Sequence, residues 1–152
     1  MSLPLQVSVE GDLAADADPR RLALRVPTSL DVIEEAVDVV ARHCLAGGLP
    51  ARRARFNLRV ALCEALANAI VYGNGLDPAK WVEVEVTVDA EVFSVRVADQ
   101  GSGFDPGAVP EPQLPDDLEN LSGRGLFLIR RLMDAVSFND EGNAICMVLR
   151  RA

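Results

Sequence analysis

The sequence predicts an α+β two-layer sandwich, in which a mixed, mainly antiparallel sheet is covered by helices on one face. Residues 81–88 alternate strictly between valine and polar positions, and residues 91–98 repeat an alternating pattern after a short turn, as in a β-hairpin. Residues 30–45 and 51–72 instead carry apolar side chains at helical spacing. Antiparallel strands with helices between them pack as two layers around one core.

The N-terminal part of the chain divides into an arm and the start of the domain. Residues 1–20 change from apolar to small and polar residues, so we expect an N-terminal arm or an extra strand there, with one domain over residues 21–152. Residues 21–26 alternate as a first strand does. The helix over residues 30–45 follows a capping segment that contains Ser29 and stops at a glycine pair.

The C-terminal half adds a loop, a helix and two strands. Residues 107–122 hold three prolines and four acidic residues, which disfavour a continuous helix or strand. A loop of this length inside a compact domain is usually functional, often as a lid. The glycine-opened segment 123–134 is predicted to be helical, and residues 135–138 and 144–150 are predicted to be strands.

The composition is that of a globular domain with an acidic surface. The chain has 152 residues and a formal net charge of −8, which argues against nucleic acid as a main partner, because phosphate binding requires a clustered positive surface. No apolar run approaches the ~20 residues that span a bilayer, and the N-terminus has no signal-like pattern. We expect a cytoplasmic protein whose three cysteines are buried thiols.

One acid and one amide interrupt the apolar helical run over residues 51–72. Glu64 and Asn68 are four residues apart, so they project from the same stripe of the helix. A buried carboxylate without a partner is costly. The pair therefore lies on a thin solvated strip, caps a neighbouring loop or faces a ligand, and the helix alone leaves these alternatives open.

Two glycine-containing segments favour the ligand. Asp99 follows a strand and precedes Gly101 and Gly103, whereas Gly123 and Gly125 open a helix. An aspartate at a strand end can accept a hydrogen bond from the N6 amine of adenine. Glycines let the backbone approach a base or sugar closely, and the N-terminus of a helix suits phosphate oxygens.

Glu64 and Asn68 would supply the remaining chemistry of such a site. Asn68 offers an amide oxygen to Mg²⁺, and Glu64, one helical turn earlier, could accept a proton from an attacking hydroxyl or water. Each segment by itself is common turn or helix chemistry. Their combination, in this order around the acidic loop, predicts a site for ATP and Mg²⁺.

Other nucleotide sites lack the residues that they require. The sequence has no Gly-x-x-x-x-Gly-Lys-Ser/Thr segment and no Gly-x-Gly-x-x-Gly that opens a helix after an early strand. Lys80, the only lysine, stands without the other elements of a eukaryotic-type kinase. His43, the only histidine, lies in a segment that does not resemble the phospho-acceptor of a histidine kinase.

Residues 64–74, 99–106 and 123–134 together resemble the N box and the two glycine boxes of the GHKL ATPase family, which includes gyrase, Hsp90, histidine kinases and MutL. Segment 123–134 is most similar to the anti-sigma factor serine/threonine protein kinases within that family. The resemblance covers roughly residues 22–150 and implies the Bergerat-type ATP-binding fold.

The resemblance also implies a role for each residue of the site. Glu64 would be the catalytic base, Asn68 the magnesium ligand and Asp99 the adenine anchor. The loop over residues 107–122 would be the ATP lid. The remaining residues would cradle the nucleotide and its phosphates, and these are Gly101, Gly103, Gly123, Arg124 and Gly125.

Two positions depart from the pattern of the family. Tyr72 stands where histidine is common, and Asn143-Ala144 stands where a threonine often helps to bind the base. Either change could alter the affinity for the nucleotide, but neither removes the central carboxylate and amide.

By this resemblance the protein would be an ATP-dependent serine protein kinase and an anti-sigma factor of a bacterial partner-switching system. It would bind a sigma factor and phosphorylate a serine on an anti-anti-sigma antagonist of STAS type, as a homodimer. The alternative is a non-catalytic module that holds ATP or ADP as a structural ligand and regulates a partner protein by sequestration. A detached histidine-kinase catalytic domain is disfavoured, because no phospho-acceptor helix is evident.

Overall fold

The computed structural model of the chain describes residues 5–10, 20–102 and 121–151. Within these ranges the strands form one six-stranded sheet in the order β1-β2-β3-β4-β6-β5, and every pairing is antiparallel. The strands are β1 (Gln6–Glu10), β2 (Arg20–Pro27), β3 (Trp81–Val88), β4 (Val92–Ala98), β5 (Ala135–Phe138) and β6 (Ala144–Arg150).

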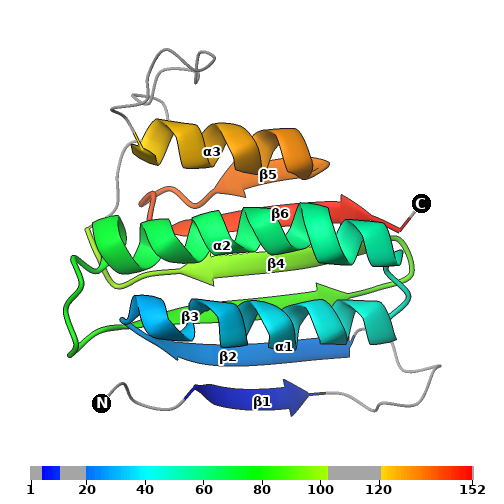
Figure 1. Cartoon of the computed structure of the whole chain (residues 1–152), viewed down its shortest axis with the longest axis horizontal. Helices are drawn as coiled ribbons and strands as arrows, with labels where there is room; N and C mark the ends of the chain where they lie inside the picture. The colour runs from blue at the N-terminus through cyan, green and yellow to red at the C-terminus, as the bar shows by residue number, and fades with distance from the viewer. Residues whose placement is uncertain (1–4, 11–19, 103–120, 152) are drawn as a thin grey trace.

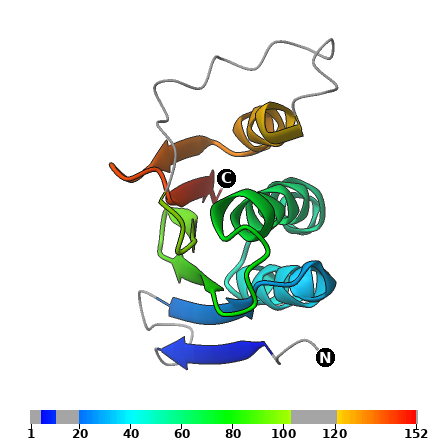
Figure 2. The ribbon, with the colours of Figure 1, turned by 90° about the vertical axis from the view of Figure 1, so that its left-hand side faces the viewer.

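The helices cover one face of this sheet, as Figure 2 shows from the end of the strands. Figure 1 shows α1, α2 and α3 side by side on the near face, with β1 and β5 at the two edges of the sheet. The helical segments are η1 (Leu30–Val32), α1 (Ile33–Ala46), η2 (Arg53–Leu58), α2 (Arg59–Asn68), η3 (Ala69–Gly73) and α3 (Leu121–Leu132). The predicted α+β two-layer sandwich is confirmed.

Local sequence explains where the first helices begin and how the second one changes. Ser29 caps η1 by accepting a hydrogen bond from the backbone N–H of Asp31 at 3.3 Å. The helix predicted over residues 51–72 is present, but it contains two π-helical segments, η2 and η3, on either side of α2. Widened turns of this kind often lie at functional sites, and η3 borders the cavity described below.

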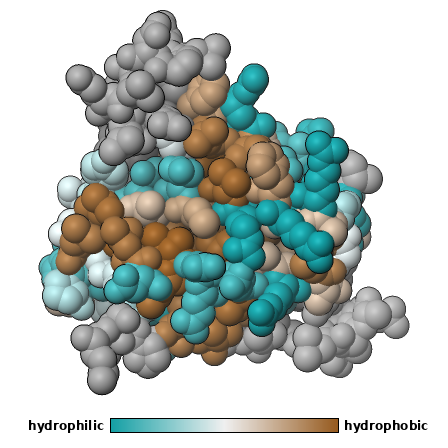
Figure 3. All heavy atoms as spheres, viewed as in Figure 1, coloured by the Kyte–Doolittle hydropathy of each residue, from teal (hydrophilic) through white to brown (hydrophobic). Residues whose placement is uncertain are grey.

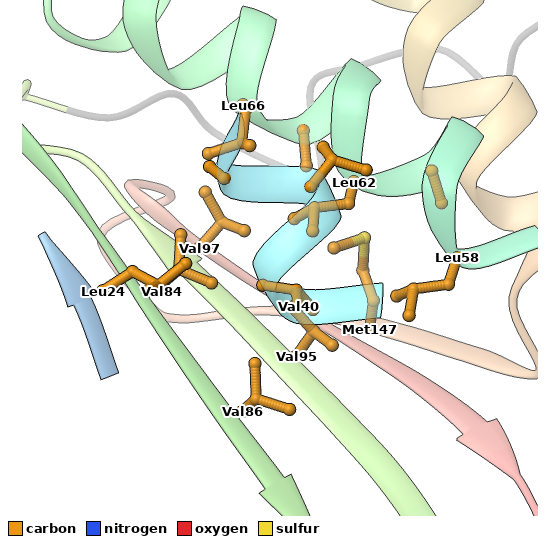
Figure 4. Close-up of a cluster of buried hydrophobic side chains, with 14 of the residues drawn as sticks. Leu24, Val40, Leu58, Leu62, Leu66, Val84, Val86, Val95, Val97 and Met147 are labelled. Atoms are coloured by element: carbon orange, nitrogen blue, oxygen red, sulfur yellow. The ribbon is translucent and has the colours of Figure 1, made fainter. Parts of the chain in front are cut away.

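The core lies between the helices and the sheet (Figure 4). Leucines 58, 62 and 66 follow one stripe of the η2–α2 helix and are at most 1% exposed. They face Val40 of α1 and alternate residues of the strands β3, β4 and β6, which include Val84, Val86, Val95, Val97 and Met147. Helical spacing and strand alternation therefore point the same apolar set into one layer.

Only one of the three cysteines is buried, so the prediction of three buried thiols is wrong for the other two. Burial raises the pKa of the Cys44 thiol to about 12. Cys63 and Cys146 are partly exposed, and all three are free. Cys146 alternates with the core residues Ile145 and Met147, so its side chain faces the opposite side of the sheet.

The outer surface of the helical layer is uneven in character (Figure 3). Hydrophilic side chains cross its centre and right, whereas hydrophobic ones gather at the left, where α1 begins and α2 ends, and also at the upper and lower centre. Leu30, Tyr72 and Leu76 belong to segments at that end and are 51%, 59% and 51% exposed. None of the helices in the described ranges contains an apolar stretch of the length that a bilayer requires.

We expect Leu62→Ala to lower the free energy of unfolding by about 2–5 kcal/mol, because a side chain with 0% exposure leaves a cavity between α2 and the sheet. Urea titration followed by circular dichroism measures the loss. Leu30→Ala removes a half-exposed leucine and should cost less than about 0.5 kcal/mol. Equal losses from both substitutions would contradict this assignment of the core.

Candidate functional site

The first residues of α3 lie directly against the acid and the amide of α2. A Cβ atom at Gly125 would stand 2.8 Å from Glu64 Oε2 and 3.2 Å from Asn68 Nδ2. Glycine thus lets the two helices approach, because a side chain here would displace the polar groups of α2. The structure therefore brings together the segments at residues 64–68 and 123–125, which are distant in the sequence.

Asp99 and Gly101 contact Gly73, at the end of η3, which continues the helix α2. A Cβ atom at Gly73 would stand 2.3 Å from Asp99 Oδ2, and one at Gly101 would stand 2.1 Å from the carbonyl oxygen of Gly73. Asp99 Oδ1 accepts a hydrogen bond from the backbone N–H of Gly101 at 2.8 Å. The end of β4 is therefore packed onto η3 through two glycines, with the carboxylate between them.

Residues of α2, η3, β4, α3 and the turn between β5 and β6 line one cavity of about 310 Å³, whereas Glu64, Gly101 and Gly125 are not part of its lining. The volume is at the lower end of the range for small-molecule sites. Asn68 and Asp99 contribute polar groups to its lining, and Asn143 contributes a third. The remaining lining residues are Ala65, Ala69, Tyr72, Gly73, Val97, Ser102, Leu126, Ile129, Phe138, Gly142, Ala144 and Ile145. A largely apolar hollow with a few convergent polar groups suits a flat, partly polar ligand such as a nucleobase.

Not every residue predicted for the site can be placed. Gly103 and residues 107–120 of the proposed lid lie outside the described residues, and so does the side chain of Arg124. Gly123 lies in the first turn of α3, because the helix begins at Leu121 rather than at the glycine. The backbone N–H groups of the first turn of α3, which have no partner within the helix, directly precede Gly125 in the sequence.

A buried amide that the sequence did not single out ties the site together. Asn74 is 2% exposed, and its Nδ2 donates to the carbonyl oxygen of Trp81 at 3.0 Å and to Thr28 Oγ1 at 3.2 Å. Its Oδ1 accepts from the backbone N–H of Gln100 at 2.8 Å. Asn74 thus fixes the residue after Asp99 to the end of the helix, a role that only its burial reveals.

The described residues contain no cluster of three or more histidine, cysteine or acidic side chains that could hold a metal ion. Mg²⁺ bound with a nucleotide does not require such a cluster, since phosphate oxygens and water complete its coordination. Asn68 and the neighbouring Glu64 can serve such an ion with few protein ligands, because Gly125 leaves beside them a space that a Cβ atom would fill.

We expect Asn74→Ala to lower the free energy of unfolding by about 2–3 kcal/mol, because the substitution leaves the Gln100 N–H and the Trp81 carbonyl without their partner. Chemical denaturation measures the loss. Asn57→Ala is the matched control, since the Asn57 amide makes one part-buried bond, to the carbonyl of Leu132 at 2.8 Å. This control should cost at most about 1 kcal/mol, and a larger loss than that of Asn74→Ala would refute the role of Asn74.

Two aspartates should respond to neutralisation in opposite directions. Burial raises the pKa of Asp99 above its ordinary value, partly offset by the Gly101 N–H. A raised pKa means that the ionised form weakens the folded state once the pH exceeds the unfolded value, so Asp99→Asn should stabilise the fold at pH 7. Hydrogen bonds from the Arg150 N–H and from Arg53 lower the pKa of Asp134, so Asp134→Asn should destabilise it.

Melting temperatures of the two variants, measured from pH 7 down to about pH 4, near the ordinary pKa of an aspartate, check the signs. The difference between Asp99→Asn and the parent should narrow as the pH falls through the pKa of Asp99 in the folded state toward its unfolded value. A destabilising Asp99→Asn would contradict the burial assigned to Asp99, and a stabilising Asp134→Asn would contradict the hydrogen bonds assigned to Asp134.

The comparisons with known proteins agree with this geometry. A family model described as histidine kinase-like ATPase domain matches residues 26–149. Serine-protein kinase RsbW of Listeria monocytogenes serotype 4a is 32% identical over 99 residues, and RsbW of Oceanobacillus iheyensis is 28% identical over 98 residues. In both comparisons the match covers 60% of this chain and 62% of the relative.

The anti-sigma F factor of Clostridium perfringens strain 13 is 29% identical over 101 residues, which cover 60% of this chain and 69% of that protein. The chain thus spans about three fifths of the length of the RsbW relatives it matches. The similarity of this chain to these relatives confirms the resemblance to anti-sigma factor kinases. With the family model matched over most of its length, the chain belongs to the histidine kinase-like ATPase family of GHKL type.

Proposed function

We propose that this protein is an ATP-dependent serine protein kinase that also acts as an anti-sigma factor in a bacterial partner-switching system. One observation carries the proposal: Gly125 of α3 packs against Glu64 and Asn68, and Asn68 lines the same cavity as Asp99. Asn68 and Asp99 thus share one hollow of nucleotide-base size, and Glu64 and Gly125 lie beside Asn68 without lining it.

Each side chain has a chemical task in this proposal. The Asp99 carboxylate accepts a hydrogen bond from the exocyclic amine of adenine in the apolar part of the cavity. The backbone N–H groups at the start of α3 bind phosphate oxygens, helped by Gly123 and Gly125. Glu64 accepts the proton of the attacking serine hydroxyl, beside Asn68 on the same helical stripe.

Asn68 is the residue that would hold Mg²⁺, through its side-chain oxygen. Bound ATP would supply the phosphoryl group, and Mg²⁺ would neutralise the charge that develops during its transfer. Gly101 and Gly103 would keep the backbone close to the base, and Arg124 would add a positive charge beside the phosphates. These roles agree with the packing of Gly73 and Gly101 around Asp99.

The relatives support the choice of substrate and partners. Two of the proteins to which this chain is similar are named serine-protein kinase, and a third is named anti-sigma F factor. We infer that the chain works in the cytoplasm as a homodimer that binds a sigma factor. We also infer that its substrate is a serine on an anti-anti-sigma protein of STAS type.

We expect Glu64→Gln to lower phosphoryl transfer at least ~100-fold, because the amide cannot accept the serine proton. Binding of ATP should persist, since the Glu64 carboxylate is not assigned to bind the adenine or the phosphates. Transfer of labelled phosphate from ATP with Mg²⁺ to an anti-anti-sigma protein of the same organism measures the first effect. The rise in melting temperature with ATP measures the second.

Glu85→Gln is the control, since Glu85 is exposed on β3 and should leave both measurements unchanged. Equal transfer by the parent and by Glu64→Gln would contradict a catalytic role for Glu64. An ATP-dependent rise in melting temperature without any transfer by the parent would favour the alternative, a module that binds nucleotide and regulates its partner by sequestration.

A further inference from the structure

Two asparagines organise the turn between β5 and β6, at the edge of the cavity. Asn139 Oδ1 accepts from the backbone N–H groups of Asn143 and Ala144 at 3.0 and 3.1 Å. Asn139 Nδ2 donates to Asn143 Oδ1 at 2.7 Å. The side chain of Asn139 therefore closes the turn and holds the side chain of Asn143 in one orientation.

Asn143 in turn holds the loop that carries Asp99. Its Nδ2 donates to the carbonyl oxygen of Gly101 at 3.3 Å, and its own carbonyl oxygen accepts from the Asp99 N–H at 2.9 Å. Gly101 then donates its N–H to Asp99 Oδ1 at 2.8 Å. An unbroken series of hydrogen bonds runs from Asn139 through Asn143 and Gly101 to the carboxylate of Asp99.

The amide of Asn143 has no free N–H to offer a nucleobase. Its second N–H points to Glu141 Oε2 at 3.4 Å, so both donors are engaged. Within the described part of the chain Asp99 Oδ1 is also engaged, whereas Oδ2 accepts no hydrogen bond. Oδ2 is thus the oxygen left to meet an exocyclic amine, and its position depends on groups that do not touch the base themselves.

We propose that Asn139 and Asn143 are positioning residues that set the selectivity of the site for a 6-aminopurine, by fixing the carboxylate of Asp99. The inference rests on the proposed function, because it assumes that Asp99 meets the base. The contact between Gly101 and Gly73 holds the same loop at a second place.

The test compares the affinities of the full chain for ATP and for purine riboside 5′-triphosphate, which lacks the exocyclic amine, by calorimetry with Mg²⁺. We expect the parent to prefer ATP by at least ~10-fold, the value of one hydrogen bond of about 1.4 kcal/mol. Asn143→Ala should reduce this preference to about threefold or less, chiefly by weakening the binding of ATP. Asn139→Ala should have the same effect and serves as an independent variant if Asn143→Ala does not fold.

Two further variants separate positioning from general loosening of the fold. Asp140→Ala changes an exposed side chain of the same turn and should leave the preference for ATP unchanged. In the Asp99→Asn background, Asn143→Ala should alter the preference no further, since the group on which it acts has been replaced.

Equal weakening of both nucleotides by Asn143→Ala, with the preference retained, would overturn the positioning role and leave the proposed function intact. If Asn143→Ala left the binding of both nucleotides unchanged, the positioning role would also be overturned, and the proposed function would remain. Failure of the parent chain to bind ATP at all would overturn the proposed function, and this inference with it.

Discussion

The structure depends on the burial of the η2–α2–η3 helix against the centre of the sheet. Leu58, Leu62 and Leu66 place one stripe of this helix in the core, and Glu64 and Asn68 then fall on the flank that α3 covers. The polar pair is neither in the core nor fully solvated. Because burial of the leucines sets the rotation of the helix, packing energy on one side determines which groups face the cavity on the other.

Glycines and amides, rather than charges, assemble the site around that helix. Gly73, Gly101 and Gly125 allow three close contacts that a Cβ atom would obstruct. Asn74 supplies the hydrogen bonds that hold the loop after β4 to the helix. A neutral amide can be buried and satisfied at lower cost than a charge. The loop can therefore keep Asp99 partly desolvated.

Much of the architecture follows from pattern alone. The alternation of residues 81–88 and the strands at 135–138 and 144–150 appear with the predicted bounds, because strand alternation is a local property of a half-buried sheet. The π-helical segments η2 and η3 were not predicted, since the apolar spacing in the sequence does not distinguish a π-helical turn from an α-helical one. Asn74 and Asn139 were also missed, because an asparagine in a turn looks the same in sequence whether it is solvated or buried.

The sequence by itself determined the class of the fold, the positions of the glycines and the presence of one carboxylate and one amide on a common helical stripe. These features depend on residue type and short-range spacing. Only the tertiary structure decided that Gly125 meets Glu64, that Gly73 and Gly101 enclose Asp99, and that the turn at residues 139–143 reaches the same cavity. Such contacts join segments far apart in the chain, and their distances depend on how the helices pack on the sheet.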